Sequence, residues 1–262
     1  MYAFEIERPE TVEEAIKALS RDEAQPLGGG QTLIPTLKQR LAMPSVLVSL
    51  TGIAAMRGIC TDDAGLLCIG GGTTHGEVAA GADKFAGLAM MAAKIGDPAV
   101  RNRGTMGGSL ANNDPSACWP AAALGAGATI VTDKREIAAD DFFQGMFDTA
   151  RDEGEIITEA KFPVPEKSAY AKFEQPASRF ALVAAFVAKY SGGVRVAITG
   201  ASESGVFRWT EAEEALGRDF GPGALDGLHV EPDGMIGDLH GTPEYRAHLV
   251  GVMTRRAVEA AR

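Results

Sequence analysis

The sequence predicts an α+β fold: a small α/β unit, a mainly antiparallel middle region, and a C-terminal antiparallel sheet with helices. Three patterns predict it. Strands alternate with helices over 1–55, strand hairpins recur over 56–165, and a strand meander followed by helices fills 166–262. At 262 residues and 45% hydrophobic content the chain can bury a sizeable core. We therefore expect one domain over 1–165, with the two subdomains just named, and a C-terminal domain over 166–262.

The first region reads as a β-α-β unit followed by a glycine turn, a helix and a strand. Thr11 and Glu14 form the capping-box pattern that starts a helix. The expected strands cover 4–7, 25–27 and 46–50, and the expected helices cover 11–20 and 36–41. Gly28, Gly29 and Gly30 provide the turn from the second strand towards the second helix.

The middle region predicts hairpins with helices inserted between them. The expected strands cover 57–61, 66–69, 128–132, 135–138 and 155–163, with helices beginning near Gly76 and covering 87–95. From Ile95 to Ala123 hydrophobic periodicity is lost, which predicts a long irregular loop. Such a loop in an ordered domain usually binds something.

The stretch from Phe162 to Tyr170 holds two prolines and no periodicity, so it is the expected domain boundary. Beyond it the expected strands cover 170–174, 181–190, 194–200 and 206–209, and the expected helices cover 211–216 and 244–261.

Charge and composition exclude several classes of partner. The 35 acidic and 25 basic residues give a net charge of -10, and the basic residues are dispersed, so we expect no nucleic-acid partner. No apolar run approaches the roughly 20 residues of a membrane span, and the start does not resemble a signal peptide. We therefore expect a cytoplasmic protein without a membrane span.

The three cysteines, Cys60, Cys68 and Cys118, form no C-x-x-C pair, so we expect no metal site or iron-sulfur cluster in this chain. Cys60 and Cys68 could face each other across the predicted hairpin. In a reducing compartment we expect both to be free thiols.

Two glycine loops are candidates for binding an anion. Glycines without Cβ atoms let successive amide N–H groups turn inward around a phosphate, as the loops Gly28–Leu33 and Gly104–Ser109 could. Neither loop matches G-x-G-x-x-G or the P-loop, and a single such loop is usually only a turn. Two together, followed by Asn112 and Asp114, suit an extended dinucleotide.

Two neighbouring features also have structural interpretations, which we favour. Arg101, Asn102 and Arg103 are expected to pin the long loop to nearby carboxylates and carbonyls, because arginines in irregular segments usually serve structure. His75 has no accompanying Ser or Cys nucleophile, so a structural hydrogen bond is expected at the start of its helix.

At these residues the sequence resembles the FAD-binding medium subunits of the molybdenum hydroxylases, the group of carbon-monoxide dehydrogenase and xanthine dehydrogenase. The matching stretches occur in the family's order over essentially the whole chain: LGGGQTLIPTLKQR, IGGGTTHGEVA, IGDPAVRNRGTMGGSLANNDPSACWPAA and DDFFQGMFDTARDEGEIITEAKFPVP. The resemblance implies the two-subdomain FAD-binding fold of the vanillyl-alcohol oxidase type, with a small C-terminal domain.

The resemblance also implies a set of residues around FAD. Those around the pyrophosphate and ribityl chain would be Gly28, Gly29, Gly30, Gln31, Thr32, Leu33, Thr105, Gly107, Gly108, Ser109, Asn112 and Asp114. Ile157 would lie near the adenine or along the ribityl path. Two positions depart from the family pattern: Cys118 replaces an acidic residue, and Glu174 stands where many relatives place a base. Lys172 is the nearest replacement cation, and Phe180 could pack on the flavin or in the core.

By resemblance the chain would be an electron-transfer subunit without catalytic acid or base residues. Its FAD would take electrons from an iron-sulfur small subunit, served by a molybdopterin cofactor on a large subunit, and pass them to an external acceptor. The complex would be a dimer of heterotrimers. The alternatives are a stand-alone flavin reductase or oxidase of the same fold, and a scaffold without cofactor.

Overall fold

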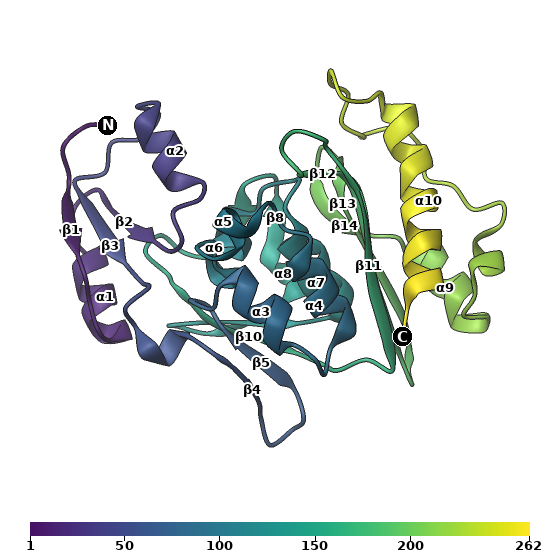
Figure 1. Ribbon diagram of the computed structural model, residues 1–262, viewed down its shortest axis with the longest axis horizontal. Coiled ribbons are helices and arrows are strands. Elements are labelled where there is room, and N and C mark those ends of the chain that lie inside the picture. Colours follow the sequence, from purple (N-terminus) through teal and green to yellow (C-terminus); the bar gives the residue numbers. More distant parts are fainter.

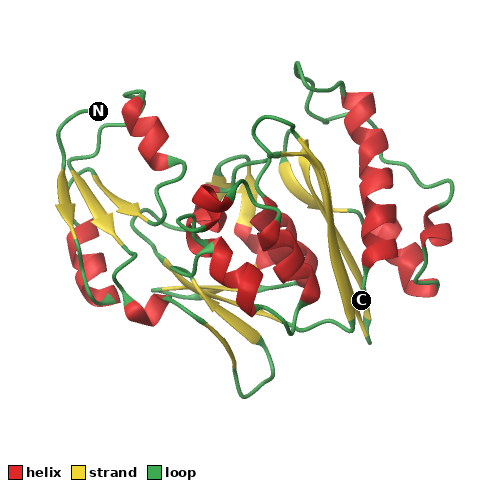
Figure 2. Ribbon diagram, in the orientation of Figure 1, coloured by secondary structure: helices red, strands yellow, loops and turns green.

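The computed structural model describes residues 1–262 and arranges them in three consecutive layers (Figure 1). A small α/β unit at the N-terminal end leads to a middle region rich in helices, and a C-terminal sheet covered by a long helix completes the molecule. Figure 2 shows that most of the helices of the middle region lie between the strands of the two larger sheets. This mixed helix and sheet architecture confirms the predicted α+β class.

The small unit is a three-stranded parallel sheet with strand order β1-β3-β2. Its elements are β1 (Glu5–Glu7), α1 (Val12–Leu19), β2 (Ala24–Leu27), α2 (Leu33–Lys38) and β3 (Val46–Ser49). Half of the predicted capping box forms: Thr11 Oγ1 accepts a bond from the Glu14 amide, but the Glu14 carboxylate accepts from the Glu10 amide instead of that of Thr11. The second helix starts and ends three residues before the predicted bounds. The left-handed backbone of Arg40, with φ of 61°, lies just beyond its end.

The middle sheet is antiparallel with strand order β4-β5-β10-β6-β7. Its strands are β4 (Ile59–Thr61), β5 (Leu67–Gly70), β6 (Thr129–Thr132), β7 (Glu136–Ala138) and β10 (Ile157–Phe162). Cys60 pairs with Cys68 across the β4–β5 hairpin, and both are free thiols as predicted. The central strand β10 carries a register shift between Ile157 and Glu159.

The prediction of one long irregular loop over 95–123 is wrong. The middle region holds η1 (Ala54–Met56), α3 (His75–Gly81), α4 (Ala86–Ala93), α5 (Pro98–Arg101), α6 (Met106–Asn112), α7 (Cys118–Ala126), α8 (Ala139–Phe142) and the hairpin β8 (Phe143–Gly145) and β9 (Asp148–Thr149). Asp97 and Thr105 cap α5 and α6 with their side chains. All nine residues of α7 are buried, so this helix has no polar face to produce a periodic pattern.

The C-terminal region is an antiparallel meander with helices on its outer face. It consists of β11 (Lys167–Glu174), β12 (Ala181–Tyr190), β13 (Gly193–Ser202), β14 (Gly205–Arg208), α9 (Thr210–Arg218), η2 (Pro222–Leu225) and α10 (Pro243–Ala260). Alternate residues of β12 pack into two different cores, one on each side of the sheet. Ala184 and Phe186 pack with the middle region, whereas Val183 and Val187 pack with the outer helices. Burial on both faces explains why β12 reads as a continuous apolar run.

The largest core crosses the predicted boundary at residue 165. Phe186 of β12 packs at a ring-centroid distance of 5.9 Å from Phe85, and Trp119 belongs to the same cluster. The division into domains 1–165 and 166–262 therefore stays a prediction. None of the helices combines the length and the apolar character needed to cross a membrane.

Candidate functional site

A cavity of about 630 Å³ runs between the small unit, the middle helices and β11. Its volume lies within the range of small-molecule sites. All fifteen residues predicted for the site line it: Gly28, Gly29, Gly30, Gln31, Thr32, Leu33, Thr105, Gly107, Gly108, Ser109, Asn112, Asp114, Cys118, Ile157 and Lys172. The structure thus brings together residues that are up to 144 positions apart between Gly28 and Lys172. Their role in binding stays a prediction.

The loop after β2 forms the first wall. None of the amide N–H groups from Gly28 to Thr32 donates to another atom of the chain. The loop keeps its shape through Gly30, whose φ is +71°, and through the Gln31 side-chain amide, which donates to the Gly29 carbonyl at 2.9 Å. The hydroxyl of Thr32 makes no capping bond to α2. This wall therefore presents a row of free donors.

The loop before α6 forms the second wall, and it touches the first directly. A Cβ on Gly29 would lie 1.9 Å from the Arg103 carbonyl oxygen, and one on Gly28 would lie 2.9 Å from Thr105 Oγ1. Gly107 is pressed in the same way against the backbone of Gly71, to whose carbonyl its amide donates at 2.9 Å. Glycine is needed here because backbone meets backbone without room for a side chain.

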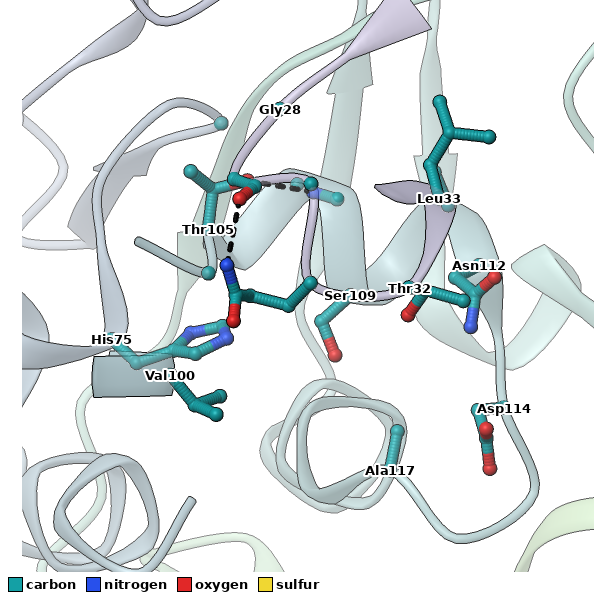
Figure 3. A pocket seen from close by; sticks show the side chains of 18 of the residues that line it. Gly28, Thr32, Leu33, His75, Val100, Thr105, Ser109, Asn112, Asp114 and Ala117 are labelled. Carbon is teal, nitrogen blue, oxygen red and sulfur yellow. Dashed lines mark hydrogen bonds between the residues drawn. The ribbon is translucent and has the colours of Figure 1, made fainter. Parts of the chain in front are cut away.

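Beyond α6 the wall turns polar again, and Figure 3 shows Thr32, Asn112 and Asp114 on the side of the cavity away from His75 and Val100. Asp114 accepts a bond from the Ser116 amide at 2.8 Å. Burial raises the pKa of Asp114, against the effect of this bond. Next to Asn112, the left-handed Asn113 ends the helix, and its side chain donates to the Gly145 and Asp148 carbonyls.

At the β11 end of the cavity a lysine ammonium is buried without a carboxylate partner. Lys172 Nζ donates to the carbonyls of Lys94 and Arg179 and lies 3.8 Å from Cys118 Sγ. Burial raises the pKa of the Cys118 thiol, an effect that the Lys172 ammonium opposes. Phe180 lines the same end and is half exposed, and Glu174 is exposed and does not line the cavity.

His75 has the structural hydrogen bond that its position predicts. Its Nδ1 accepts from Trp119 Nε1 at 3.0 Å, which leaves the proton of the neutral ring on Nε2. Burial, helped by the charge of Arg101, lowers the pKa of His75 to about 4. Arg101 pins the loop as expected, by donating to the Ile95 and Gly96 carbonyls. The same expectation is wrong for Arg103, which is exposed and whose side chain forms no hydrogen bond or ion pair.

Residues that the sequence analysis missed complete the wall at the small-unit end. Gly71, Gly72 and Met56 line it together with Arg151 and the fully buried Glu155. The glycine cluster before His75 was a usable signal, because it repeats the composition of the first loop. The sequence around Arg151 carried no such signal, because only the folded turn between β9 and β10 brings this residue to the cavity.

The Glu155 carboxylate is fixed by its own neighbours. Burial acts to raise its pKa, but hydrogen bonds from Arg135, Thr132 and the Asp152 amide outweigh burial and hold the pKa at about 2. Glu155 therefore stays ionised and is engaged within the protein.

The donor set fits a dinucleotide. Unpaired backbone amides and a free hydroxyl suit the oxygens of a pyrophosphate, and the apolar side chains at the small-unit end suit a flat base. The buried ammonium of Lys172 suits a ring system that becomes negative on reduction. No three His, Cys, Asp or Glu side chains are grouped so that they could hold a metal ion.

Comparisons with known proteins agree with this chemistry. Residues 2–165 match the family model described as the FAD binding domain in molybdopterin dehydrogenase. The chain is 32% identical to the carbon monoxide dehydrogenase medium chain of Afipia carboxidovorans, over 99% of this chain and 97% of that one. It is also 32% identical to the nicotine 6-hydroxylase medium subunit of Paenarthrobacter nicotinovorans, over 97% and 95%. Among solved structures, reconstituted CO dehydrogenase from Oligotropha carboxidovorans superimposes with a TM-score of 0.87 at 30% identity, covering 98% and 97%.

Proposed function

The chain belongs to the family of FAD-binding domains of molybdopterin dehydrogenases, and from this premise we propose that it relays electrons within a molybdenum hydroxylase. It is the medium, FAD-binding subunit of such an oxidoreductase. The observation that carries the proposal is the set of unpaired amides from Gly28 to Thr32 on a loop that lines the cavity.

In this proposal each wall of the cavity holds one part of FAD. The amides of Gly28 to Thr32, with Thr105, Gly108 and Ser109, bind the pyrophosphate. Asn112 and Asp114 bond along the ribityl chain, and Ile157 packs near the adenine or along the ribityl path. Gln31, Leu33 and Gly107 keep the loops in shape. FAD supplies the capacity to accept electrons from a one-electron donor and pass them on.

Lys172 and Cys118 would serve the flavin end of the site. The Lys172 ammonium is held by two carbonyls and has no carboxylate partner, so its charge stays available to stabilise a negative ring. Cys118 is neutral, because burial raises the pKa of its thiol. An acidic residue at this position would compete for the ammonium, and a thiol does not.

The relatives are medium chains or subunits of multi-subunit enzymes, so small and large partner subunits are implied for this chain. We propose that the small one carries iron-sulfur clusters, that the large one carries the molybdopterin cofactor, and that the complex is a dimer of heterotrimers. The three free thiols favour a cytoplasmic location.

Affinity purification of the tagged chain from its native host tests the proposal. We expect a complex in which FAD, iron and molybdenum co-elute, and substrate reduces the flavin only when the large and small subunits are present. Size-exclusion chromatography then gives the number of heterotrimers. A yellow protein that elutes alone, without iron or molybdenum, would instead support a stand-alone flavin reductase or oxidase. A chain that stays colourless with added FAD would contradict both.

A further inference from the structure

One partly buried cation that lines the cavity has donors that the protein does not use. Arg151 lies on the turn between β9 and β10 and lines the cavity. Its Nη1 donates to the Glu155 carbonyl at 2.6 Å. Its Nε is buried without any partner, and its Nη2 donates to no atom of the chain. Burying the Nε donor of a guanidinium without a partner is costly unless a ligand engages it.

No carboxylate compensates the charge of Arg151. It forms no ion pair within 4 Å, and the nearby Glu155 carboxylate is already bound by Arg135, Thr132 and the Asp152 amide. Burial lowers the pKa of Arg151, with only the charge of Glu155 opposing it. An acceptor-rich or anionic group in the cavity would relieve this desolvation.

Arg135, on the same network, shows what a purely structural arginine looks like here. Its Nε and Nη2 both donate to the Glu155 carboxylate, and Nη2 also donates to the Ala150 carbonyl. Arg151 lies beside the same carboxylate and forms a single backbone bond. The turn therefore does not need the remaining donors of Arg151.

We propose that Arg151 recognises the AMP half of the bound dinucleotide and so makes the site selective for FAD over FMN. The inference rests on the proposed function. Arg151 donates to the carbonyl of Glu155, whose neighbour Ile156 packs with Met56 and Leu50 in the core of the small unit. Lys172, by contrast, lies on β11. Adenine nitrogens and the adenylate phosphate offer the acceptors that the guanidinium lacks, and FMN contains neither.

Flavin titrations of the full-length chain, stripped of its cofactor, test this. The variants are Arg151→Met, which keeps the length of the side chain, and Arg151→Lys, which keeps the charge. Arg218→Met, an exposed position on α9, is the matched control. Flavin fluorescence gives the Kd for FAD and FMN, calorimetry gives the Kd for ADP, and thermal unfolding of the apo-protein reports stability.

We expect Arg151→Met to raise the Kd for FAD and for ADP about tenfold or more, as for the loss of a hydrogen bond to a charged group. FMN affinity should stay within about twofold, and Arg151→Lys should lie between. Unchanged FAD and ADP affinity, or an equal loss for FAD and FMN with a lower apo-protein Tm, would overturn the inference and leave the proposed function intact. If the wild-type chain binds no FAD, the proposed function itself is wrong and the inference falls with it.

Discussion

His75 shows how a single side chain at this site is held in one protonation state. The ring is 5% exposed and accepts from Trp119, a bond that an imidazolium could not accept because both of its nitrogens are donors. Burial and the charge of Arg101 therefore favour the neutral ring, with the pKa lowered to about 4. His75 serves the wall of the cavity and is not a proton carrier near neutral pH.

This pKa makes folding stability depend on pH in a defined window. The unfolded chain protonates His75 near pH 6.5 and the folded chain only near pH 4, so stability falls as the pH drops through that interval. From this residue we expect the free energy of unfolding to be about 2 kcal/mol smaller at pH 5 than at pH 7.

Urea unfolding of the wild type and of His75→Gln at both pH values checks the expectation. The glutamine keeps an acceptor for Trp119 and should remove most of that difference. The exposed His248, changed to Gln, should leave it in place. A His75→Gln protein with the wild-type pH dependence would contradict the role given to His75.

A site residue could be predicted from the sequence only where its local structure requires a particular residue type. The glycine loops were found because backbone-to-backbone contact demands a residue type that stands out in the sequence. Lys172 and Cys118 came only through the resemblance, because their proximity depends on α7 meeting β11. Arg151 was missed, since an arginine next to acidic residues reads as a solvated turn until the structure shows its buried Nε.

At the scale of elements, the site is made by loops that pack through glycines. The first loop lies against Arg103–Gly104, and Gly107 against Gly71, so the cavity walls brace each other. The strands and long helices were predicted well, because their apolar periodicity reflects one buried face. The short capped helices and the wholly buried α7 were not predicted, since neither leaves a periodic pattern.

Two glycine-to-alanine changes should act in opposite directions. At Gly29 the added Cβ would meet backbone atoms of Arg103 and Gly104 within 2.6 Å, so the two walls must separate. We expect Gly29→Ala to lose flavin and to destabilise the chain by about 1–3 kcal/mol. Gly251, inside α10 with nothing within 4 Å, is the control.

Gly251→Ala should stabilise the chain by about 0.5–1 kcal/mol and keep flavin content unchanged. Flavin absorbance per chain and urea unfolding measure both effects. A Gly29→Ala protein that retains full flavin and wild-type stability would show that the two loops are not braced as described.

At the scale of the whole molecule, the C-terminal sheet is part of the support of the site. One face of β12 packs on α4 and α7 through Phe186. Polar bonds add to this contact: Ser168 accepts from the Gly87 amide at 2.9 Å, and Thr199 donates to the Ala117 carbonyl at 2.8 Å. The pattern of the sequence changes near residue 165, but the sequence could not show that a core crosses that point. Core contacts between distant segments leave no local signal.

A chain cut after residue 165 tests how far the FAD-binding region depends on that sheet. Without β11 to β14, the apolar faces of α4 and α7 would meet water, and Lys172 and Phe180 would be missing from the cavity. We expect fragment 1–165 to aggregate or to lack fixed tertiary structure, and the full chain to unfold in one step at this core. Phe186→Ala in the full chain is a milder test, and we expect it to lower the free energy of unfolding by about 3–5 kcal/mol. Phe180→Ala, at a half-exposed position, is the control and should lower it much less. Near-ultraviolet circular dichroism and urea unfolding give both answers. A 1–165 fragment that is folded, monomeric and able to retain FAD would mean that the sheet is an independent domain, because the shared core would then contribute little to holding the site.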